Sequence, residues 1–277
     1  MYGPTHDHGS GPWEMLLPVA GVTLLAVGYL LLGRRARRRT GSRPADRWRA
    51  AAFLTGCLLL GIALLPPMAS FAHRDFRGHM FQDLLIGMYA PLALVLSAPV
   101  STLLRALPAT LARQLTRLLR SRPLGVLSHP ITALLLSSGG LAVLYFTPLY
   151  NAAAGQPVLH RLLQIHALLA GFVFAWAIAG ADPAPHRPGA SARLVVLGIA
   201  VAAHAVVSRL LYDGYFVEVD ASVAQIRGGA EIMYYGGDIA ELLLAAALVA
   251  TWRPARNLAR RSIRPRQLSP SSADPAL

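Results

Sequence analysis

The chain of 277 residues is strongly apolar and strongly basic: 55% of its residues are hydrophobic, 14% are charged, and its formal net charge is +13. Because a soluble domain carries about 25% charged residues, this composition predicts a polytopic helical membrane protein rather than a soluble α-helical bundle. A pI near 11.1 would indicate a nucleic-acid partner in a soluble protein, but here the arginines flank apolar runs, so no such partner is expected.

Seven apolar segments are predicted to be transmembrane helices of an all-α fold, since their runs are continuous rather than alternating. At 1.5 Å per residue each is long enough to span about 30 Å. They cover residues 13–33, 49–71, 80–104, 130–148, 159–180, 194–212 and 231–252. We therefore expect an extracytoplasmic tail at 1–12, a seven-helix domain at 13–252, and a basic, largely disordered cytoplasmic tail at 253–277.

The distribution of arginines predicts the orientation of these helices. Of the 26 basic residues, 21 fall in the loops 34–49, 105–129 and 181–193 and in the tail from 253 onward. Positive residues accumulate on the cytoplasmic side, so the N-terminus is predicted to lie outside and the C-terminus inside. A short basic amphipathic helix is expected within 105–129 at the inner membrane surface.

Polar side chains begin the third segment, where His79, Gln82 and Asp83 stand at positions i, i+3 and i+4. On a helix these three residues share one face. Ionisable groups at membrane depth are costly, and they are usually buried in protein and tied to function. This face is therefore the first candidate site.

Other segments place further polar residues in the same outer half of the bundle, where lipid cannot satisfy them, so they are expected to face one another. The predicted metal ligands are His79, Asp83, His160, His166 and His204, with Gln82, Met80, Glu231 and Asp238 as secondary candidates. The single cysteine, Cys57, excludes a cysteine-based site. Imidazoles with carboxylates suit copper or zinc, and the thioether of Met80 would favour Cu(I).

The same residues also allow alternatives without a metal. A proton relay or a structural hydrogen-bond network would use the same groups. His204 also fits a core histidine bonded to a backbone carbonyl, and Asp238 and Glu241 also fit ion pairs with Arg209 or Arg161. His6 and His8 fall in the outer tail, where solvated residues are the expected interpretation. No Gly-rich phosphate loop, His-Glu-x-x-His or Gly-x-Ser-x-Gly motif is present, so no enzyme is predicted.

With these residues in view, the chain resembles the CtaG-like cytochrome c oxidase assembly factors associated with caa-type oxidases, in their actinobacterial form. Matching stretches recur in order from about residue 70 to 255. They are His79-Met-Phe-Gln82-Asp83-Leu-Leu with Ala90-Pro91, Ser128-His129-Pro130, Tyr145-Phe-Thr-Pro148-Leu-Tyr150, His160 with His166, Gly180-Ala-Asp182-Pro183, His204-Ala205, and Gly228-Gly229-Ala-Glu-Ile-Met-Tyr-Tyr-Gly236-Gly237-Asp238. The single motifs are short, and the ordered set is what makes the resemblance specific.

The resemblance implies a seven-helix protein of a bacterial plasma membrane that assists maturation of an aa-type oxidase. Copper handling beside oxidase subunits is the role usually proposed for such proteins. The family pattern His-Met-x-Gln-His ends here in Asp83, a harder ligand that favours Cu(II) or Zn(II). This departure either retunes the site or abolishes it.

Three functions are therefore carried forward. The first is an assembly factor that binds copper in the outer half of the bundle and passes it to the oxidase. The second is a proton-coupled transporter, which needs a polar path through the inner half of the bundle. The third is a scaffold without metal, whose polar cluster fixes helix packing. Whether the chain forms a homo-oligomer is left open.

Overall fold

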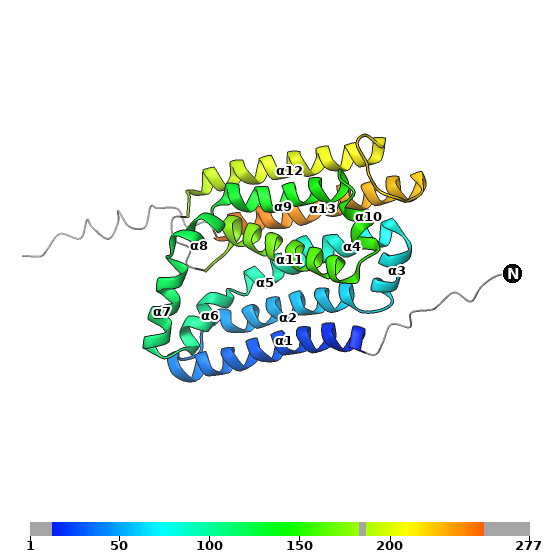
Figure 1. Ribbon diagram of the computed structural model, residues 1–277. Helices are drawn as coiled ribbons and strands as arrows, with labels where there is room; N and C mark the ends of the chain where they lie inside the picture. The colour runs from blue at the N-terminus through cyan, green and yellow to red at the C-terminus, as the bar shows by residue number, and fades with distance from the viewer. Residues whose placement is uncertain (1–12, 183–186, 252–277) are drawn as a thin grey trace, which may run out of the picture.

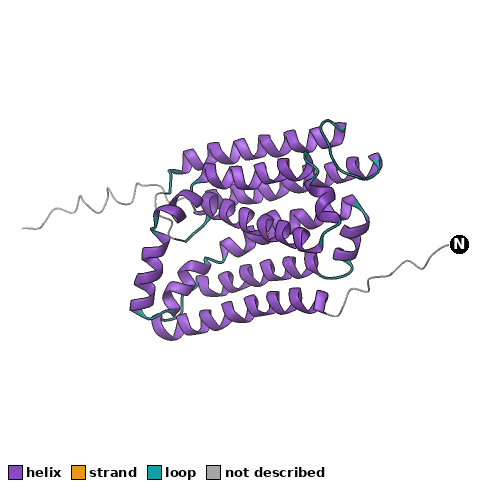
Figure 2. Cartoon of the chain, viewed as in Figure 1, coloured by secondary structure: helices purple, strands orange, loops and turns teal. Residues whose placement is uncertain are grey.

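The computed structural model describes residues 13–182 and 187–251, and all regular structure within these ranges is helical (Figure 2). Six of its helical segments are long and apolar enough to cross a membrane: Leu16–Thr40, Ala45–Leu64, Phe76–Leu96, Pro157–Ala179, Ala190–Asp213 and Val223–Thr251. The all-α, polytopic membrane architecture is thus confirmed. The two predicted tails, with His6 and His8, lie outside the described residues.

The long helices run side by side in alternating directions (Figure 1). In chain order they are α1 (Trp13–Thr40), α2 (Ala45–Leu64), a segment built from α4 (Phe76–Leu84), η1 (Leu85–Tyr89) and α5 (Ala90–Leu96), α9 (Pro130–Tyr145), α11 (Pro157–Ala179), α12 (Ala190–Asp213) and α13 (Val223–Thr251). α11 packs against α5, α9 and α13, while α1 lies along α2 and α6 at one edge.

This alternation gives the bundle two chemically different ends. One end, here called the histidine end, carries His73, His79 and His160, and α1, α11 and α13 begin there. The other end, here called the arginine end, carries the arginines at the finish of α1, at the start of α2, and along α6 to α8. The arginines of the predicted inner loops do gather at one end; that this end is cytoplasmic, and the N-terminus outside, stays a prediction.

The seventh crossing also stays a prediction. The segment expected at 130–148 is α9, whose 16 residues extend about 24 Å, less than the roughly 30 Å of a hydrocarbon core. It nevertheless lies between α11 and α12 and runs parallel to the long helices (Figure 1). A short helix, α10 (Leu149–Ala154), follows it at the histidine end.

The second predicted segment, 49–71, is too long by about seven residues, because α2 stops at Leu64. Pro66 and Pro67 follow, and a proline disfavours a helical conformation in the residue before it. A separate helix, α3 (Met68–Arg74), then turns back along α4. Asp75 ends α3 and begins α4, where its carboxylate accepts a hydrogen bond from the backbone N–H of Arg77 at 2.9 Å, as an N-cap residue does.

The third segment, expected as one helix over 80–104, is interrupted twice. Pro91 has no N–H to donate to the carbonyl of Gly87, and at this place the helix widens into the π-helical turn η1. A Cβ on Gly171 of α11 would collide with that carbonyl, so the missing side chain lets the two helices touch. The second break is at Ala98, which has a φ of 51° before Pro99, and α6 (Pro99–Ala106) begins there.

The predicted amphipathic helix in 105–129 is confirmed as α7 (Ala109–Leu119), followed by α8 (Arg122–Leu127). α7 runs across the arginine end, roughly perpendicular to the long helices (Figure 1). Its leucines Leu111 and Leu118 are exposed, and it buries none of its residues. Its contact with the membrane surface remains a prediction.

Hydrogen bonds and an ion pair connect the helices at the arginine end. Arg105 binds Asp46 at 2.7 Å, with both side chains nearly buried. Asp182 accepts hydrogen bonds from the N–H groups of Val100 and Ser101 and thereby caps α6. Arg193 donates to the carbonyl of Ile178 at 2.7 Å, at the end of α11 where positive charge is favourable.

Candidate functional site

His79 and Asp83 form the centre of the histidine end, one turn apart on α4. Nε2 of His79 lies 3.3 Å from Oδ2 of Asp83, an ion-pair distance, and this buried nitrogen has no well-aligned hydrogen-bond partner among the described residues. The hydroxyl of Tyr145 on α9 donates to the same Oδ2 at 2.6 Å. The predicted pair is therefore inside the protein, and one imidazole nitrogen is left free for a further ligand.

His160, at the start of α11, lies beside this pair. Its ring centroid is 5.9 Å from that of His79, and its Nε2 is 3.1 Å from the side-chain nitrogen of Gln164. The structure thus brings together three of the five predicted primary ligands, His79, Asp83 and His160. Gln164 holds the His160 ring in place from one turn further along the helix.

His73 is a functional candidate that sequence reasoning missed. Its ring centroid lies 5.2 Å from that of His160, and its Nδ1 is 2.6 Å from the carbonyl oxygen of Ala69. Since a carbonyl only accepts, Nδ1 carries a proton, which in the neutral ring leaves the lone pair on Nε2, the arrangement typical of metal-binding histidines. The signal was Asp75, a favoured N-cap residue, which breaks the chain and turns α3 toward the site.

An aromatic wall closes the site on the side of α9 and α10. The ring of His79 packs edge-on against Tyr150 at 4.9 Å and against Tyr145 at 6.5 Å, and Phe76 lies next to all three. Burial raises the pKa of Tyr150, which lies outside the predicted spans of the bundle, to about 12. Its hydroxyl therefore stays neutral beside the histidines at physiological pH.

The secondary candidates on α4 have structural partners. Met80 is buried, with its sulfur 3.8 Å from the Tyr145 hydroxyl. Gln82 is also buried, but its amide nitrogen donates to the carbonyl of Ala63 at 2.7 Å, at the end of α2. Met80 thus stays next to the site, whereas Gln82 points to a neighbouring helix.

The remaining primary candidates lie elsewhere. His166 is exposed on α11, with its Nε2 next to Gly140 of α9. His204 on α12 is 4% exposed, and its Nε2 is 3.0 Å from the carbonyl oxygen of Met233. The alternative of a core histidine bonded to a backbone carbonyl therefore describes His204, and its ring packs where Gly237 of α13 leaves space.

The acidic candidates on α13 are also separate from the histidine group. Glu231 is exposed and lines an open groove with Arg77 and Tyr235. Asp238 is partly buried one turn beyond Tyr234, and Glu241 is buried with one carboxylate oxygen unpartnered among the described residues.

The alternative of an ion pair between Arg209 and an acid of α13 is not found among the described residues. Arg209 instead binds Asp213 on its own helix, with 2.8 Å between the nitrogen and the oxygen. The carboxylates of Asp238 and Glu241 are therefore left without this guanidinium as a counter-ion.

The imidazole and carboxylate side chains at the histidine end are of the chemical types that bind copper or zinc. Two imidazoles bound at about 2 Å to one metal would hold their centroids about 5–6 Å apart, and the two observed separations are 5.2 and 5.9 Å. Within the described ranges, however, no three His, Cys, Asp or Glu side chains are yet arranged around one point. A bound ion would need the side chains of His73 and His160 to rotate toward His79.

Comparison with known proteins identifies the family. Residues 27–255 match the model of the cytochrome c oxidase caa3 assembly factors, Caa3_CtaG. The chain belongs to this family. The match covers far more than half of the chain and includes both ends of the bundle, so the resemblance seen in the motifs is confirmed. The family is described by a role in the assembly of cytochrome c oxidase.

Relatives in three mycobacteria are similar over much of the chain. An uncharacterized protein of Mycobacterium leprae is 32% identical over 255 residues, which are 84% of this chain and 38% of the relative. Uncharacterized proteins of Mycobacterium bovis and Mycobacterium tuberculosis are each 32% identical over 200 residues, 70% of this chain and 30% of theirs. The chain thus spans less than two fifths of the length of these relatives. No solved structure matches.

Proposed function

We propose that this protein assists maturation of an aa-type cytochrome c oxidase in a bacterial plasma membrane by binding copper at the histidine end. The proposal rests on one observation above all: the buried, unpartnered Nε2 of His79 beside the Asp83 carboxylate. A buried polar atom without a partner is costly, and such atoms often mark a ligand site. Oxidase subunits that receive copper are the proposed partners.

The gradient of exposure supports a role in transfer. His73 is exposed, His160 is partly buried, and His79 is 7% exposed. An ion captured by His73 at the surface would meet His160 next and then His79 with Asp83. Tyr145 would hold the carboxylate in place, as hydrogen bonds to a ligand usually do. Copper bound at this end would be the ion that is passed to the oxidase.

The core next to the arginine end favours a metal site that has no polar route to that end of the bundle. Next to the arginine end the core consists of apolar side chains from α5, α9, α11, α12 and α13, including Val95, Phe174, Ile178 and Leu248. A proton-coupled transporter needs a polar route through this layer. The buried carboxyl of Glu241 is the observation that favours transport, and it stands at the edge of the layer.

Deletion and complementation test the proposal. Cells without the gene should lose the absorbance of mature aa-type haem and oxidase activity, and copper supplementation should restore part of both. Wild type should restore both fully, His79→Ala and His160→Ala should not, and His166→Ala, whose histidine lies outside the site, should behave as wild type. All variants are checked for equal amounts in the membrane.

Other outcomes identify the alternatives. Normal oxidase in the deletion strain would contradict an assembly role. Reduced protein yield in both His79→Ala and His160→Ala, with oxidase activity proportional to that yield, would indicate a scaffold. Proton uptake by vesicles that is abolished in Glu241→Gln but not in His79→Ala would indicate a transporter.

A further inference from the structure

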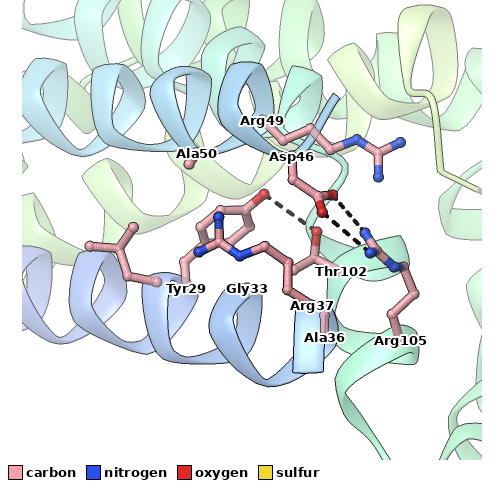
Figure 3. Close-up of a pocket in the computed structure, with 10 residues that line it drawn as sticks. Tyr29, Gly33, Ala36, Arg37, Asp46, Arg49, Ala50, Thr102 and Arg105 are labelled. Carbon is pink, nitrogen blue, oxygen red and sulfur yellow. Dashed lines mark hydrogen bonds and ion pairs between the residues drawn. The ribbon is translucent and has the colours of Figure 1, made fainter. Parts of the chain in front are cut away.

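A small cavity at the arginine end is independent of the histidine site. It lies between α1, α2 and α6 and has a volume of about 20 Å³, which is room for roughly one water or one phosphate oxygen. Arg37, Arg49 and Arg105 line it, together with the acid Asp46 (Figure 3). Tyr29 and Thr102 form its floor and are bonded to each other and to the backbone.

The charges in this cavity are not balanced. Arg105 donates to both oxygens of Asp46, at 2.7 and 3.3 Å, and also to Thr40 and the carbonyl of Gly41. The only acid of the lining is therefore already used. Nη1 of Arg49 is buried and has no partner among the described residues. Three guanidiniums against one carboxylate leave the guanidiniums of Arg37 and Arg49, which lie on opposite sides of the lining in Figure 3, without an acid of the lining.

We propose that this cavity binds the phosphate of an anionic phospholipid from the leaflet at the arginine end. A phosphodiester carries one negative charge and several acceptor oxygens, and guanidinium groups match them with charge-assisted hydrogen bonds. One phosphate oxygen would enter the cavity toward Nη1 of Arg49, and the others would meet Arg37 at the rim. Basic pockets between transmembrane helices near the headgroup region bind lipids in this manner.

The neighbouring surface supports a lipid rather than a free ion. The opening lies where α1 leaves the apolar part of its length and enters its arginine run. Toward the middle of α1, on the side away from its arginine run, Leu25 is exposed, so acyl chains attached to a phosphate in the cavity would run along apolar side chains of this helix. A free phosphate would gain the same ionic contacts but not this apolar contact.

The contributions of the positive charges and of the open space in the cavity to lipid binding can be tested separately. Arg37→Gln with Arg49→Gln removes both unbalanced charges, and Arg38→Gln, on the same helix but outside the cavity, is the matched control. Gly33 lines the cavity and has nothing within 4 Å of a built Cβ, so Gly33→Leu fills the opening with every charge in place. Gly21→Leu, which is equally open and far from the cavity, is its control.

Purified full-length chain is delipidated in detergent, mixed with phosphatidylglycerol, phosphatidylcholine or inorganic phosphate, and measured by native mass spectrometry. Wild type should retain one phosphatidylglycerol with at least about tenfold preference over phosphatidylcholine, since both carry the phosphate but the quaternary ammonium of phosphatidylcholine is repelled by the arginines. The double glutamine variant and Gly33→Leu should each lose that preference, and both controls should keep it.

Several results would overturn the proposal. Retention of phosphatidylglycerol by both the double variant and Gly33→Leu would exclude the cavity as its site. Equal retention of phosphatidylcholine would exclude recognition of charge. Displacement of phosphatidylglycerol by an equal concentration of inorganic phosphate would show a free-anion site instead of a lipid site.

Discussion

The two ends of the bundle solve the problem of polar groups in a membrane protein in different ways. At the arginine end, Asp46, Asp182 and Arg193 each bind a defined partner, either an opposite charge or the terminus of a helix. At the histidine end, Nε2 of His79 has no hydrogen-bond partner among the described residues, the ring of His160 lies beside that of His79, and the ring of His73 lies beside that of His160. Paired groups serve stability, and unpaired groups leave room for a ligand.

Both ends are built where helices break. Asp75 interrupts the helices beside the histidines, and Ala98 with Pro99 interrupts the chain beside the arginine end. After each break the side chains point in directions that they would not have on a continuous straight helix. If the contrast is correct, substitutions at the histidine end should change copper binding, and substitutions in the paired groups of the arginine end should change stability without changing copper binding.

The largest expected effect is that of His79→Ala on metal binding. Loss of the central imidazole should weaken copper binding by more than about 100-fold, since removal of outer-shell partners alone costs 10–100-fold. The melting temperature should also fall, because the variant leaves a cavity where the buried ring packs against Tyr150 and removes the 3.3 Å contact to Asp83. Copper titration and thermal unfolding of the purified protein measure the two effects. A large loss of stability with unchanged copper affinity would show that His79 serves the stability of the histidine end and not copper binding.

Arg105→Gln should give the opposite result. It leaves the nearly buried carboxylate of Asp46 without its partner, which costs about 3 kcal/mol of stability, while copper affinity stays at the wild-type value. Arg209→Gln is the control, since the pair of Arg209 with Asp213 is largely exposed and is worth less than about 1 kcal/mol. Equal melting temperatures for the two variants would disprove a structural role for the Arg105 pair.

Asp182→Ala should destabilise the protein by about 1–2 kcal/mol, because two N–H groups at the start of α6 lose their acceptor. Asp182→Asn keeps one acceptor oxygen and should lose less than half as much. Hydrogen exchange measures the resulting loss of protection at the amides of Val100 and Ser101. The expectation fails if both variants leave those amides as protected as in the wild type.

The smallest effect expected is that of Tyr145→Phe at the histidine end. The variant removes the hydroxyl that orients Asp83 and should weaken copper binding about tenfold. Tyr150→Phe is the matched control, since the hydroxyl of Tyr150 is not bonded to Asp83 among the described contacts. Copper titrations that do not distinguish the two variants would show that the hydrogen bond does not position a ligand.

Much of the fold follows from the sequence alone. Continuous apolar runs predicted the long helices, and the arginine loops do meet at one end of the bundle. Helix ends were wrong where proline chemistry competes with hydrophobicity. The runs 49–71 and 80–104 are apolar throughout, but Pro66, Pro67 and Pro99 end their helices early.

The candidate site was predictable only in part. The spacing of His79 and Asp83 on one helix places them on one face, and the structure keeps them there. Depth in the membrane suggested His166 and His204 as neighbours, but depth does not determine which way a side chain faces. Rotation about the axis of α11 turns His160 inward and leaves His166 exposed. His73 was missed because its position depends on the break at Asp75.

X-ray absorption at the copper edge of the loaded protein tests the central claim most directly. The account predicts copper bound by at least two imidazole nitrogens at about 2 Å, with a signal that is lost when His73, His79 and His160 are all changed to alanine and retained in His166→Ala. Copper bound without imidazole scattering, or the same spectrum from the triple variant and the wild type, would contradict it.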